Sequence, residues 1–297
     1  MKCLVTGGNG FIGSHIVDRL VSLNHEVIVI DDLSAPENEE FYYNDEATYH
    51  EKDISTDDCE KYFADVKCVF HLAARSRIQP TIGSPNRCFE VNTVGTQRVL
   101  EWSRKNGVSK VVYSGTSSLY GHDNTTPFKP NMPADCLNPY SMSKWMGEQI
   151  CRLYKQLYGI ETVVLRYFNV YGPREPVKGH YAPVIGLFKR QFKEGVPLTV
   201  VGDGNQRRDF TYIDDVVNAN IIAMNQDNFK RGVYNVGTGI NYSINDLAMM
   251  IAGKEMKTTT LPNRPAEVRE TLADIRETTE DLGWAPKVKL ENAILNY

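Results

Sequence analysis

Apolar and polar positions alternate in blocks along the first half of the chain. Five short apolar segments are predicted as β-strands: Lys2–Thr6, Glu26–Asp31, Lys67–His71, Lys110–Ser114 and Glu161–Arg166. Directly after the first of them, apolar side chains recur at helical spacing, at Phe11, Ile12, Ile16 and Leu20. Strands that alternate with helices favour a parallel sheet with helices on its faces. The pattern therefore predicts an α/β fold.

The alternation of strand-like and helix-like segments becomes less regular after about residue 167. The segment Asn169–Arg174 has the composition of a loop, and later elements are interrupted by glycine-rich turns at 202–204 and 237–239. We predict one large domain over residues 1–167 and a smaller α/β lobe over residues 168–297. The lobe is expected to cover the ligand-binding edge of the sheet, with some of its segments returning to the first domain.

Composition narrows the class of function. The 297 residues carry a net charge of -4, so nucleic acid is not expected as a partner. No apolar run is long enough to span a membrane, and MKCLVTGG lacks the apolar core of a secretory signal, so a cytoplasmic protein is expected. The six cysteines show no CxxC pairing, which predicts reduced, buried thiols and no metal site.

A glycine-rich turn lies between the first predicted strand and the first predicted helix. Gly7, Gly10 and Gly13 have the spacing of a Rossmann-type dinucleotide site. Gly7 permits the tight turn, Gly10 lets a pyrophosphate approach the backbone, and Gly13 allows close packing of helix and strand. The helix N-terminus then offers free N–H groups and a positive dipole end to the phosphates. We predict a doubly wound, Rossmann-type sheet that binds a dinucleotide.

Two carboxylates close the second predicted strand. Asp31 and Asp32 lie at the distance from Gly13 at which this type of site places an acidic residue. A carboxylate there accepts hydrogen bonds from the adenosine ribose and disfavours a 2′-phosphate. The sequence therefore predicts NAD rather than NADP.

Candidate catalytic groups follow later in the chain. Tyr140 and Lys144 are four residues apart in a predicted helix, which places them on one face. A phenol has a pKa of about 10, so its use as a base near neutral pH needs roughly 4 kcal/mol of extra stabilisation of the phenolate. A neighbouring ammonium and a positive nicotinamide ring could supply it in a dry pocket. Thr116, Ser117 and Ser118 follow a predicted strand end, where a hydroxyl can hold the substrate oxygen in line with Tyr140.

Together these motifs resemble the extended short-chain dehydrogenase/reductase family, and within it the nucleotide-sugar epimerases and dehydratases. Segments 71–74, 91–92, 166–173, 208–210, 235–237 and 282–284 also fall at positions of family motifs, so the resemblance covers essentially the whole chain. It implies an NAD-dependent enzyme in which Lys144 lowers the pKa of Tyr140 and anchors the nicotinamide ribose. It also implies cofactor contacts from Phe11, Ile12, Asp53, Ile54, Leu72, Ala73, Ala74 and Asn92.

By the same resemblance, the second lobe binds a nucleoside diphosphate sugar, and a UDP-linked sugar is expected. Asn169 resembles the residue that contacts the diphosphate, while Arg208 and Arg264 resemble a cationic clamp on it. Glu267 falls where family members often have an Asp that contacts the uridine ribose. Here Ala266-Glu267 replaces the more usual Gly-Asp pair, so the nucleoside contact departs from the family pattern.

The reaction type depends on the residues that follow Thr116. Family dehydratases have an acidic pair or at least a Glu there, and sugar-nucleotide decarboxylases also tend to have a Glu. This chain has Ser117 and Ser118, which are expected to border the sugar and are not acids at neutral pH. The resemblance therefore favours a UDP-sugar 4-epimerase that works through a 4-keto sugar. A dehydratase, a decarboxylase, an epimerase at another carbon and a non-catalytic NAD sensor remain as alternatives.

Two further expectations come from the resemblance. Thr271 matches a position at which related epimerases exclude a 2-acetamido group with a bulky aromatic residue and admit it with a small one. A small residue predicts activity on UDP-N-acetylglucosamine as well as UDP-glucose, unless Thr271 merely faces solvent. Two helices, about Pro85–Lys105 and Tyr140–Tyr158, match those that pair across the interface of family dimers, which implies a homodimer. Their apolar stripes would serve equally well against the sheet.

Overall fold

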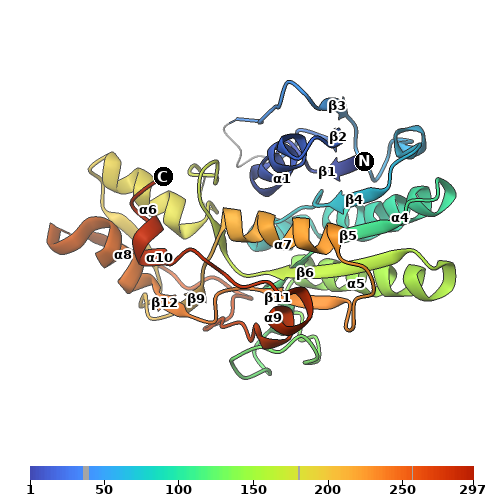
Figure 1. The fold of residues 1–297 in the computed structure, drawn as a ribbon. Coiled ribbons are helices and arrows are strands. Elements are labelled where there is room, and N and C mark those ends of the chain that lie inside the picture. Colours follow the sequence, from blue (N-terminus) through green and yellow to red (C-terminus); the bar gives the residue numbers. More distant parts are fainter. Residues whose placement is uncertain (36–39, 180, 256) are drawn as a thin grey trace.

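A seven-stranded parallel sheet forms the centre of the protein, in the order β11-β6-β5-β4-β1-β2-β3 (Figure 1). The computed structural model describes residues 1–35, 40–179, 181–255 and 257–297. The strands are β1 Lys2–Thr6, β2 Glu26–Asp31, β3 Thr48–Glu51, β4 Cys68–His71, β5 Lys110–Thr116, β6 Glu161–Tyr167 and β11 Val233–Val236. From β3 to β6 the order is 3-2-1-4-5-6, the Rossmann order, which confirms the predicted fold class.

Most strands are apolar along their whole length because helices cover both faces of the sheet. Strands β1 and β2 have the predicted bounds, whereas β5 extends beyond its prediction to Thr116 and β6 to Tyr167. Strand β3 was not predicted because its sequence, TYHE, contains no apolar run. Strand β11 comes from the second half of the chain and pairs with β6 at the edge of the sheet.

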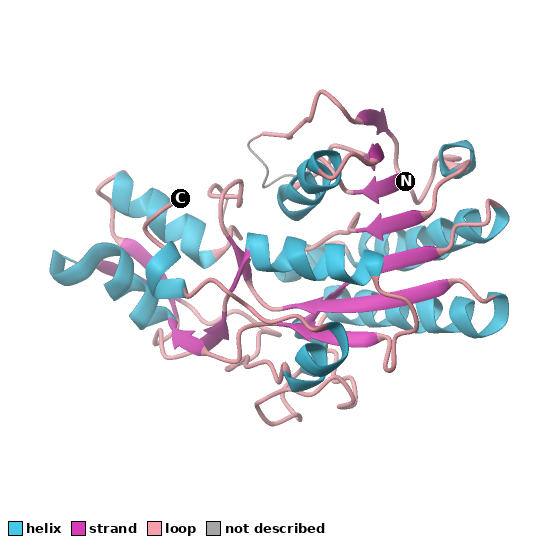
Figure 2. Ribbon diagram, viewed as in Figure 1, coloured by secondary structure: helices cyan, strands magenta, loops and turns pink. Residues whose placement is uncertain are grey.

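Helices lie in two layers on the sheet (Figure 2). One face carries α1 Phe11–Ser22, α7 Ile213–Asn225 and α9 Arg276–Leu282, whose apolar residues share a core with β1, β2 and β6. The other face carries α4 Thr96–Lys105 and α5 Pro139–Tyr158, packed on a second core. The predicted helix Pro85–Lys105 is divided into α3 Pro85–Phe89, a π-helical turn Glu90–Gly95 and α4. Such π-helical turns occur frequently at functional sites.

A smaller lobe lies beyond the carboxyl ends of the strands, at the left of Figure 1. It contains α6 Val184–Lys193, α8 Ile244–Ala252, α10 Leu290–Ala293 and the strand pairs β8 Leu198–Val201 with β13 Thr258–Leu261, β9 Arg207–Asp209 with β12 Asn241–Ser243, and β7 Val170–Tyr171 with β10 Thr211–Tyr212. Its own apolar core includes Phe188 and Leu247. The remaining elements are α2 Ile78–Gly83 and short 3₁₀ helices at Glu60–Phe63, Ser117–Tyr120 and Gly253–Glu255.

The structure also shows the state of the cysteines and the apolar length of the helices. All six cysteines are free thiols, as predicted; five are buried, and Cys136 is only partly buried. Within the ranges given above, no helix is both long enough and apolar enough to cross a bilayer.

Candidate functional site

A cavity of about 530 Å³ opens where the sheet meets the smaller lobe. Its walls come from the carboxyl ends of β1, β2, β4, β5 and β6, which is where open α/β sheets bind ligands. Every predicted site residue except Asn92 lines it, including Thr116, Tyr140 and Lys144 from the sheet side and Arg208 and Arg264 from the lobe. Residues up to 264 positions apart in the sequence, from Gly7 to Thr271, are thus brought to one place.

The glycine-rich turn fits a dinucleotide because its backbone is too crowded for side chains. Gly7 has a φ of +71°, and a Cβ there would lie 2.7 Å from the backbone nitrogen of Ala73. A Cβ on Gly13 would lie 2.1 Å from the carbonyl oxygen of Gly7, so only glycine lets α1 approach the turn this closely. Helix α1 begins after Gly10 with no side-chain cap and no acidic residue in its first turn. Its first N–H groups are therefore available to an anion in the cavity.

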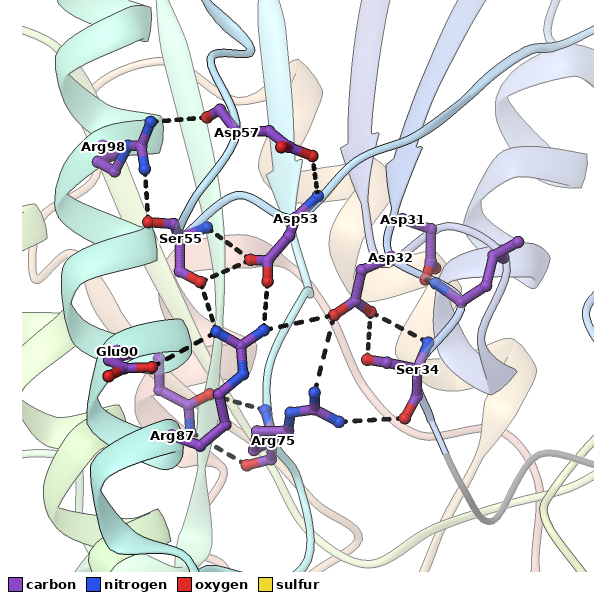
Figure 3. Close-up of polar contacts among 12 residues, drawn as sticks. Asp31, Asp32, Ser34, Asp53, Ser55, Asp57, Arg75, Arg87, Glu90 and Arg98 are labelled. Carbon is purple, nitrogen blue, oxygen red and sulfur yellow. Dashed lines mark hydrogen bonds and ion pairs between the residues drawn. The ribbon is translucent and has the colours of Figure 1, made fainter.

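The two carboxylates at the end of β2 have different partners. Asp31 accepts hydrogen bonds from the backbone N–H groups of Asn9 and Leu33, both at 3.0 Å, and burial raises its pKa. Asp32 accepts from the backbone N–H and the hydroxyl of Ser34, and it lies 3.8 Å from guanidinium nitrogens of both Arg75 and Arg87 (Figure 3). The pairing of these arginines with Asp32 was not predicted, because each meets Asp32 across a large separation in sequence.

Asp53 and Ile54 form the neighbouring wall, after β3. Ile54 is buried, while Asp53 accepts hydrogen bonds from the backbone N–H and the hydroxyl of Ser55 at 2.7 and 2.6 Å, and from Arg87 (Figure 3). Partial burial raises the pKa of Asp53, but these hydrogen bonds outweigh it, and the net pKa is lowered. Asp53 is therefore a carboxylate near neutral pH, and its charge is offset by Arg87.

Asn92 is the one predicted cofactor contact that the structure does not bring into the cavity. It is 1% exposed, within the π-helical turn, and its side-chain oxygen accepts from the backbone N–H of Arg75 at 2.7 Å. Its amide nitrogen donates to the carbonyl of Arg75 at 3.0 Å and to the hydroxyl of Ser143 at 2.9 Å. The side chain thus joins the loop after β4 to α5, behind the cavity wall.

Tyr140 and Lys144 owe their positions to the start of α5. Asn138 caps this helix in a capping box with Ser141, which fixes where the first turn begins. Thr116, the last residue of β5, acts to lower the pKa of Tyr140, which places its hydroxyl near the phenol. Thr116 also accepts from the backbone N–H of Ser118 at 3.1 Å. Tyr140 and Thr116 both line the cavity, so the predicted pairing of a phenol with a hydroxyl at the strand end stays a prediction.

The charges that act on Tyr140 differ from the expectation that Lys144 lowers its pKa. Burial raises the pKa of Tyr140 above its ordinary value, while Thr116 and the positive charge of Arg77 act against that rise. Lys144 is 3% exposed, lies 4.2 Å from the ring centroid of Tyr113, and has a pKa lowered by burial to about 8. Arg77, which lines the same cavity, is therefore a cation acting on Tyr140 that the sequence analysis missed.

A buried ion pair supports α5 from behind. The guanidinium of Arg166 on β6 contacts the carboxylate of Glu148 at 2.7 Å, with both side chains almost inaccessible. Arg166 also donates to the hydroxyl of Tyr120 at 2.8 Å. Since breaking a buried pair leaves an uncompensated charge, this contact fixes α5 against β6 firmly.

The lobe side of the cavity gathers the residues expected to meet the substrate. Arg264 lies 3.8 Å from Glu267, whose carboxylate also accepts from the amide of Gln79 at 3.4 Å. Arg208 donates to the backbone carbonyls of Arg207 and Arg269, and burial lowers its pKa. The two arginines therefore form a positive wall that is partly offset by Glu267.

Thr271 is buried rather than facing solvent. It is 3% exposed, lines the cavity, and its hydroxyl accepts from the amide of Asn169 at 3.2 Å and from the backbone N–H of Asp209 at 3.1 Å. Asn169 has a φ of 27°, in the left-handed region, and its amide also donates to the carbonyl of Asp209. The predicted diphosphate contact and the predicted gate position are thus in direct contact.

Metal-ligating side chains are not clustered in the described part of the chain: no three His, Cys, Asp or Glu side chains there are arranged to hold a metal ion. The polar side chains that line the cavity carry hydroxyls, phenols, carboxylates and several cations.

Comparison with known proteins gives consistent similarities. Residues 3–237 match the model of the NAD dependent epimerase/dehydratase family. A putative UDP-glucose 4-epimerase of Methanocaldococcus jannaschii is 38% identical, over 98% of this chain and 95% of that protein. Among solved structures, the UDP-glucose 4-epimerase of Thermotoga maritima with UDP-glucose has a TM-score of 0.92 and 34% identity, covering 99% of this chain and 96% of that one. The UDP-N-acetylglucosamine 4-epimerase of Methanobrevibacter ruminantium, in complex with UDP-N-acetylmuramic acid, has a TM-score of 0.91 and 32% identity, covering 99% and 95%.

Proposed function

The chain belongs to the NAD dependent epimerase/dehydratase family, and from this premise we propose that it is a UDP-sugar 4-epimerase. NAD as the cofactor, predicted from the glycine-rich turn and the following carboxylates, is confirmed by the family. The proposal rests on one observation, which is the set of carboxylates in the cavity. Among the described residues that line it, these are Asp31, Asp32, Asp53 and Glu267.

None of these carboxylates is among the groups that shift the pKa of Tyr140. Asp31, Asp32 and Asp53 lie at the ends of β2 and β3, and Glu267 is held by Arg264 on the lobe. Elimination of water from a sugar needs an acid at the reacting carbon, and the positions after Thr116 are occupied by Ser117 and Ser118. The cavity therefore supports oxidation and reduction without elimination, which is the requirement of an epimerase.

We propose that NAD lies along the edge of the sheet. The turn at Gly7, Gly10 and Gly13 and the first residues of α1 would hold the pyrophosphate, and Asp31 would hold the adenosine ribose. The remaining proposed contacts are Phe11, Ile12, Asp32, Asp53, Ile54, Leu72, Ala73, Ala74, Tyr140 and Lys144. When bound, NAD supplies a hydride acceptor and donor, and a positive charge that favours the phenolate.

In the proposed reaction, Tyr140 takes the proton of the sugar 4-hydroxyl while Thr116 hydrogen-bonds the same oxygen. The protein alone holds the pKa of Tyr140 high, so Arg77, Lys144 and the cofactor charge must lower it together. Oxidation at C4 then gives a 4-keto sugar. Tyr140 returns the proton when the opposite face of the ketone is reduced, so no proton or hydride is consumed over a full turnover.

Epimerisation also requires the sugar to turn while the rest of the substrate stays bound. Arg208, Arg264 and Asn169 are proposed to hold the diphosphate, because guanidinium groups match phosphate oxygens in pairs. Glu267 is proposed to contact the nucleoside, in competition with Arg264. Ser117 and Ser118 would border the sugar with neutral hydroxyls, which permit both orientations of the ring.

The sugar range is proposed to include UDP-N-acetylglucosamine as well as UDP-glucose. Thr271 lines the cavity with a small side chain, which leaves room for a 2-acetamido group. The buried position of Thr271 supports this proposal, since a residue that faced solvent would have no influence on the sugar.

A homodimer is also proposed. Several apolar side chains on α5 and the neighbouring π-helical turn are exposed and do not pack on the sheet: Val94, Met142, Met146, Leu153 and Leu157. Helices α4 and α5 lie side by side in Figure 1 and contact each other. These residues match the helices that pair in dimers of the resembling family, so a second copy of this chain is the proposed occupant.

Chromatography that separates the glucose and galactose epimers, followed by mass spectrometry of each fraction, tests the proposed reaction on UDP-[4-²H]glucose against its alternatives. An epimerase gives a product of unchanged mass that keeps its deuterium, because the hydride returns to the same carbon. A dehydratase would give a product lighter by one water. An unchanged substrate, after NAD is added, would contradict epimerisation of UDP-glucose and favour either the non-catalytic sensor or an enzyme for another nucleotide sugar, such as a decarboxylase.

A further inference from the structure

The ion pairs at the end of β2 suggest how the site discriminates between dinucleotides. We propose that Asp32 excludes NADP chiefly by neutralising Arg75, a guanidinium that would otherwise bind a 2′-phosphate. Asp32 is thus a specificity-determining residue that acts through a cation, in addition to the direct effect of Asp31 on the ribose. This inference rests on the proposed placement of the adenosine ribose beside Asp31.

The side chain of Arg75 lies at the end of the cavity near β2, where we place the adenosine ribose, rather than at the end where the sugar would bind. Its side chain donates to the backbone carbonyl of Ser34 at 3.0 Å and lies 3.8 Å from Asp32 (Figure 3). The side-chain amide of Asn92 fixes the backbone of Arg75, because it accepts a hydrogen bond from the N–H of Arg75 and donates one to its carbonyl. Arg75, Asp31 and Asp32 all line the cavity, so a group on the 2′ oxygen would meet these three side chains.

Asp32 is the carboxylate within ion-pair distance of Arg75 in the residues that the structure describes. The second arginine beside Asp32, Arg87, has other acidic partners besides Asp32. It contacts Asp53 directly, lies 3.6 Å from Glu90 and donates to the hydroxyl of Ser55 at 2.8 Å (Figure 3). Loss of the charge on Asp32 would therefore leave Arg75 as the exposed cation, whereas Arg87 would keep its carboxylates.

The contact between Arg75 and Asp32 is of a kind that a phosphate can replace. At 3.8 Å the pair is wider than a direct charge-assisted hydrogen bond, and both side chains are more than a quarter exposed. A 2′-phosphate carries about two negative charges and three acceptor oxygens, which a guanidinium binds in pairs. With Asp32 ionised, the same phosphate instead meets two adjacent carboxylates.

The test uses the full-length protein and the variants Asp32→Asn and Asp32→Ser. Asparagine keeps an oxygen that can accept from Ser34, so the loop after β2 retains its hydrogen bonds. Asp58→Asn is the matched control. It removes one charge from the same region, but Asp58 is exposed, does not line the cavity, and its carboxylate accepts from the backbone N–H of Glu60.

Each protein is incubated with an excess of isotope-labelled NAD and NADP in equal amounts. The incubation continues until the labelled NAD on the protein has reached a constant level, which shows that the cofactor carried through purification has exchanged. Free nucleotide is then removed, and the bound nucleotides are extracted and quantified. We expect wild type to hold NAD, and Asp32→Asn and Asp32→Ser to raise the bound NADP/NAD ratio by about tenfold or more. The Asp58→Asn control is expected to keep the wild-type ratio.

The double variant Asp32→Asn, Arg75→Gln identifies the cation. It is expected to lose most of the gained NADP, because the released guanidinium is absent. Wild type that holds NADP, single variants with an unchanged ratio, or a double variant that keeps the full gain would each overturn the proposal. Because the readout is bound nucleotide, the result is independent of whether the chain epimerises any sugar.

Discussion

The amide of Asn169 donates a hydrogen bond of 3.2 Å to the hydroxyl of Thr271, which lies 102 positions further along the chain. The two residues were predicted separately, one as a diphosphate contact and the other as a gate for the 2-acetamido group. Their contact means that a change at Thr271 has two separable consequences. One is a change of volume in the cavity, and the other is the loss of a hydrogen bond that holds Asn169.

Thr271→Tyr changes the volume. If Thr271 is the gate, the phenol ring fills the space for the acetamido group, so turnover of UDP-N-acetylglucosamine falls much more than turnover of UDP-glucose. Steady-state kinetics on both sugars measures the difference. Thr271→Val is the control, since it keeps the volume and removes only the hydroxyl. It is expected to cost about 1–3 kcal/mol of stability and to affect both sugars alike. Equal losses on both sugars for Thr271→Tyr would contradict the gate.

Tyr140→Phe removes the proposed base and leaves the ring. We expect kcat to fall by about 10²–10⁴ with little change in KM or in the amount of bound NAD. Tyr167→Phe is a matched control, because Tyr167 lines the same cavity but donates its hydroxyl to Asn220 at 3.0 Å. An active Tyr140→Phe enzyme would show that another group moves the proton.

Glu175 gives the stability of the protein a pH dependence. Its carboxylate accepts from the hydroxyl of Tyr297 at 2.6 Å, and burial raises its pKa from 4.5 to about 7. The folded state therefore binds this proton more tightly than the unfolded chain, so stability is fully present below about pH 4.5 and is lost as the pH rises through 7.

Glu175→Gln keeps a hydrogen-bond acceptor without the charge. Chemical unfolding over this pH range is expected to show a decline of about 3 kcal/mol in wild type that is absent in the variant. Glu26→Gln, at an exposed carboxylate, should leave the decline in place. A wild-type stability that rises with pH across this window would contradict the raised pKa.

Leu153→Glu tests the proposed homodimer. Leu153 is 47% exposed on α5, and a charge at this point would be desolvated between two copies of the chain. Light scattering after gel filtration should give a dimer for wild type and a monomer for this variant. Met249→Glu places the same charge on an exposed apolar position of α8 and is expected to leave the dimer intact. A wild-type protein that is monomeric in solution would contradict the proposed homodimer.

The sequence was most informative where local patterns fix local structure. The apolar runs at β1 and β2 and the turn at Gly7 could be located from spacing alone, because burial on both faces and a positive φ restrict the residue types. Strand β11 could not, because VYNV is short and its pairing with β6 is a long-range contact.

In the site, too, residues with a local sequence pattern could be predicted and long-range contacts could not. Motif positions such as Thr116 and Tyr140 were found because strand ends and helix spacing bring them to the cavity. The pair of Asp32 with Arg75 and the charge of Arg77 near Tyr140 were not found, since a charge pair leaves no local signature in the sequence. Asn92 was assigned to the cofactor by resemblance, yet its amide is used by Arg75 and Ser143.

The central claim is tested most directly by proton NMR of the purified protein with UDP-N-acetylglucosamine and, separately, with UDP-glucose, without added NAD. We predict that the anomeric and H4 signals of the galacto-configured sugar appear in both samples, with a cofactor that the protein already carries. If neither sugar changes even after NAD is added, the assignment as a UDP-sugar 4-epimerase acting on these substrates is contradicted.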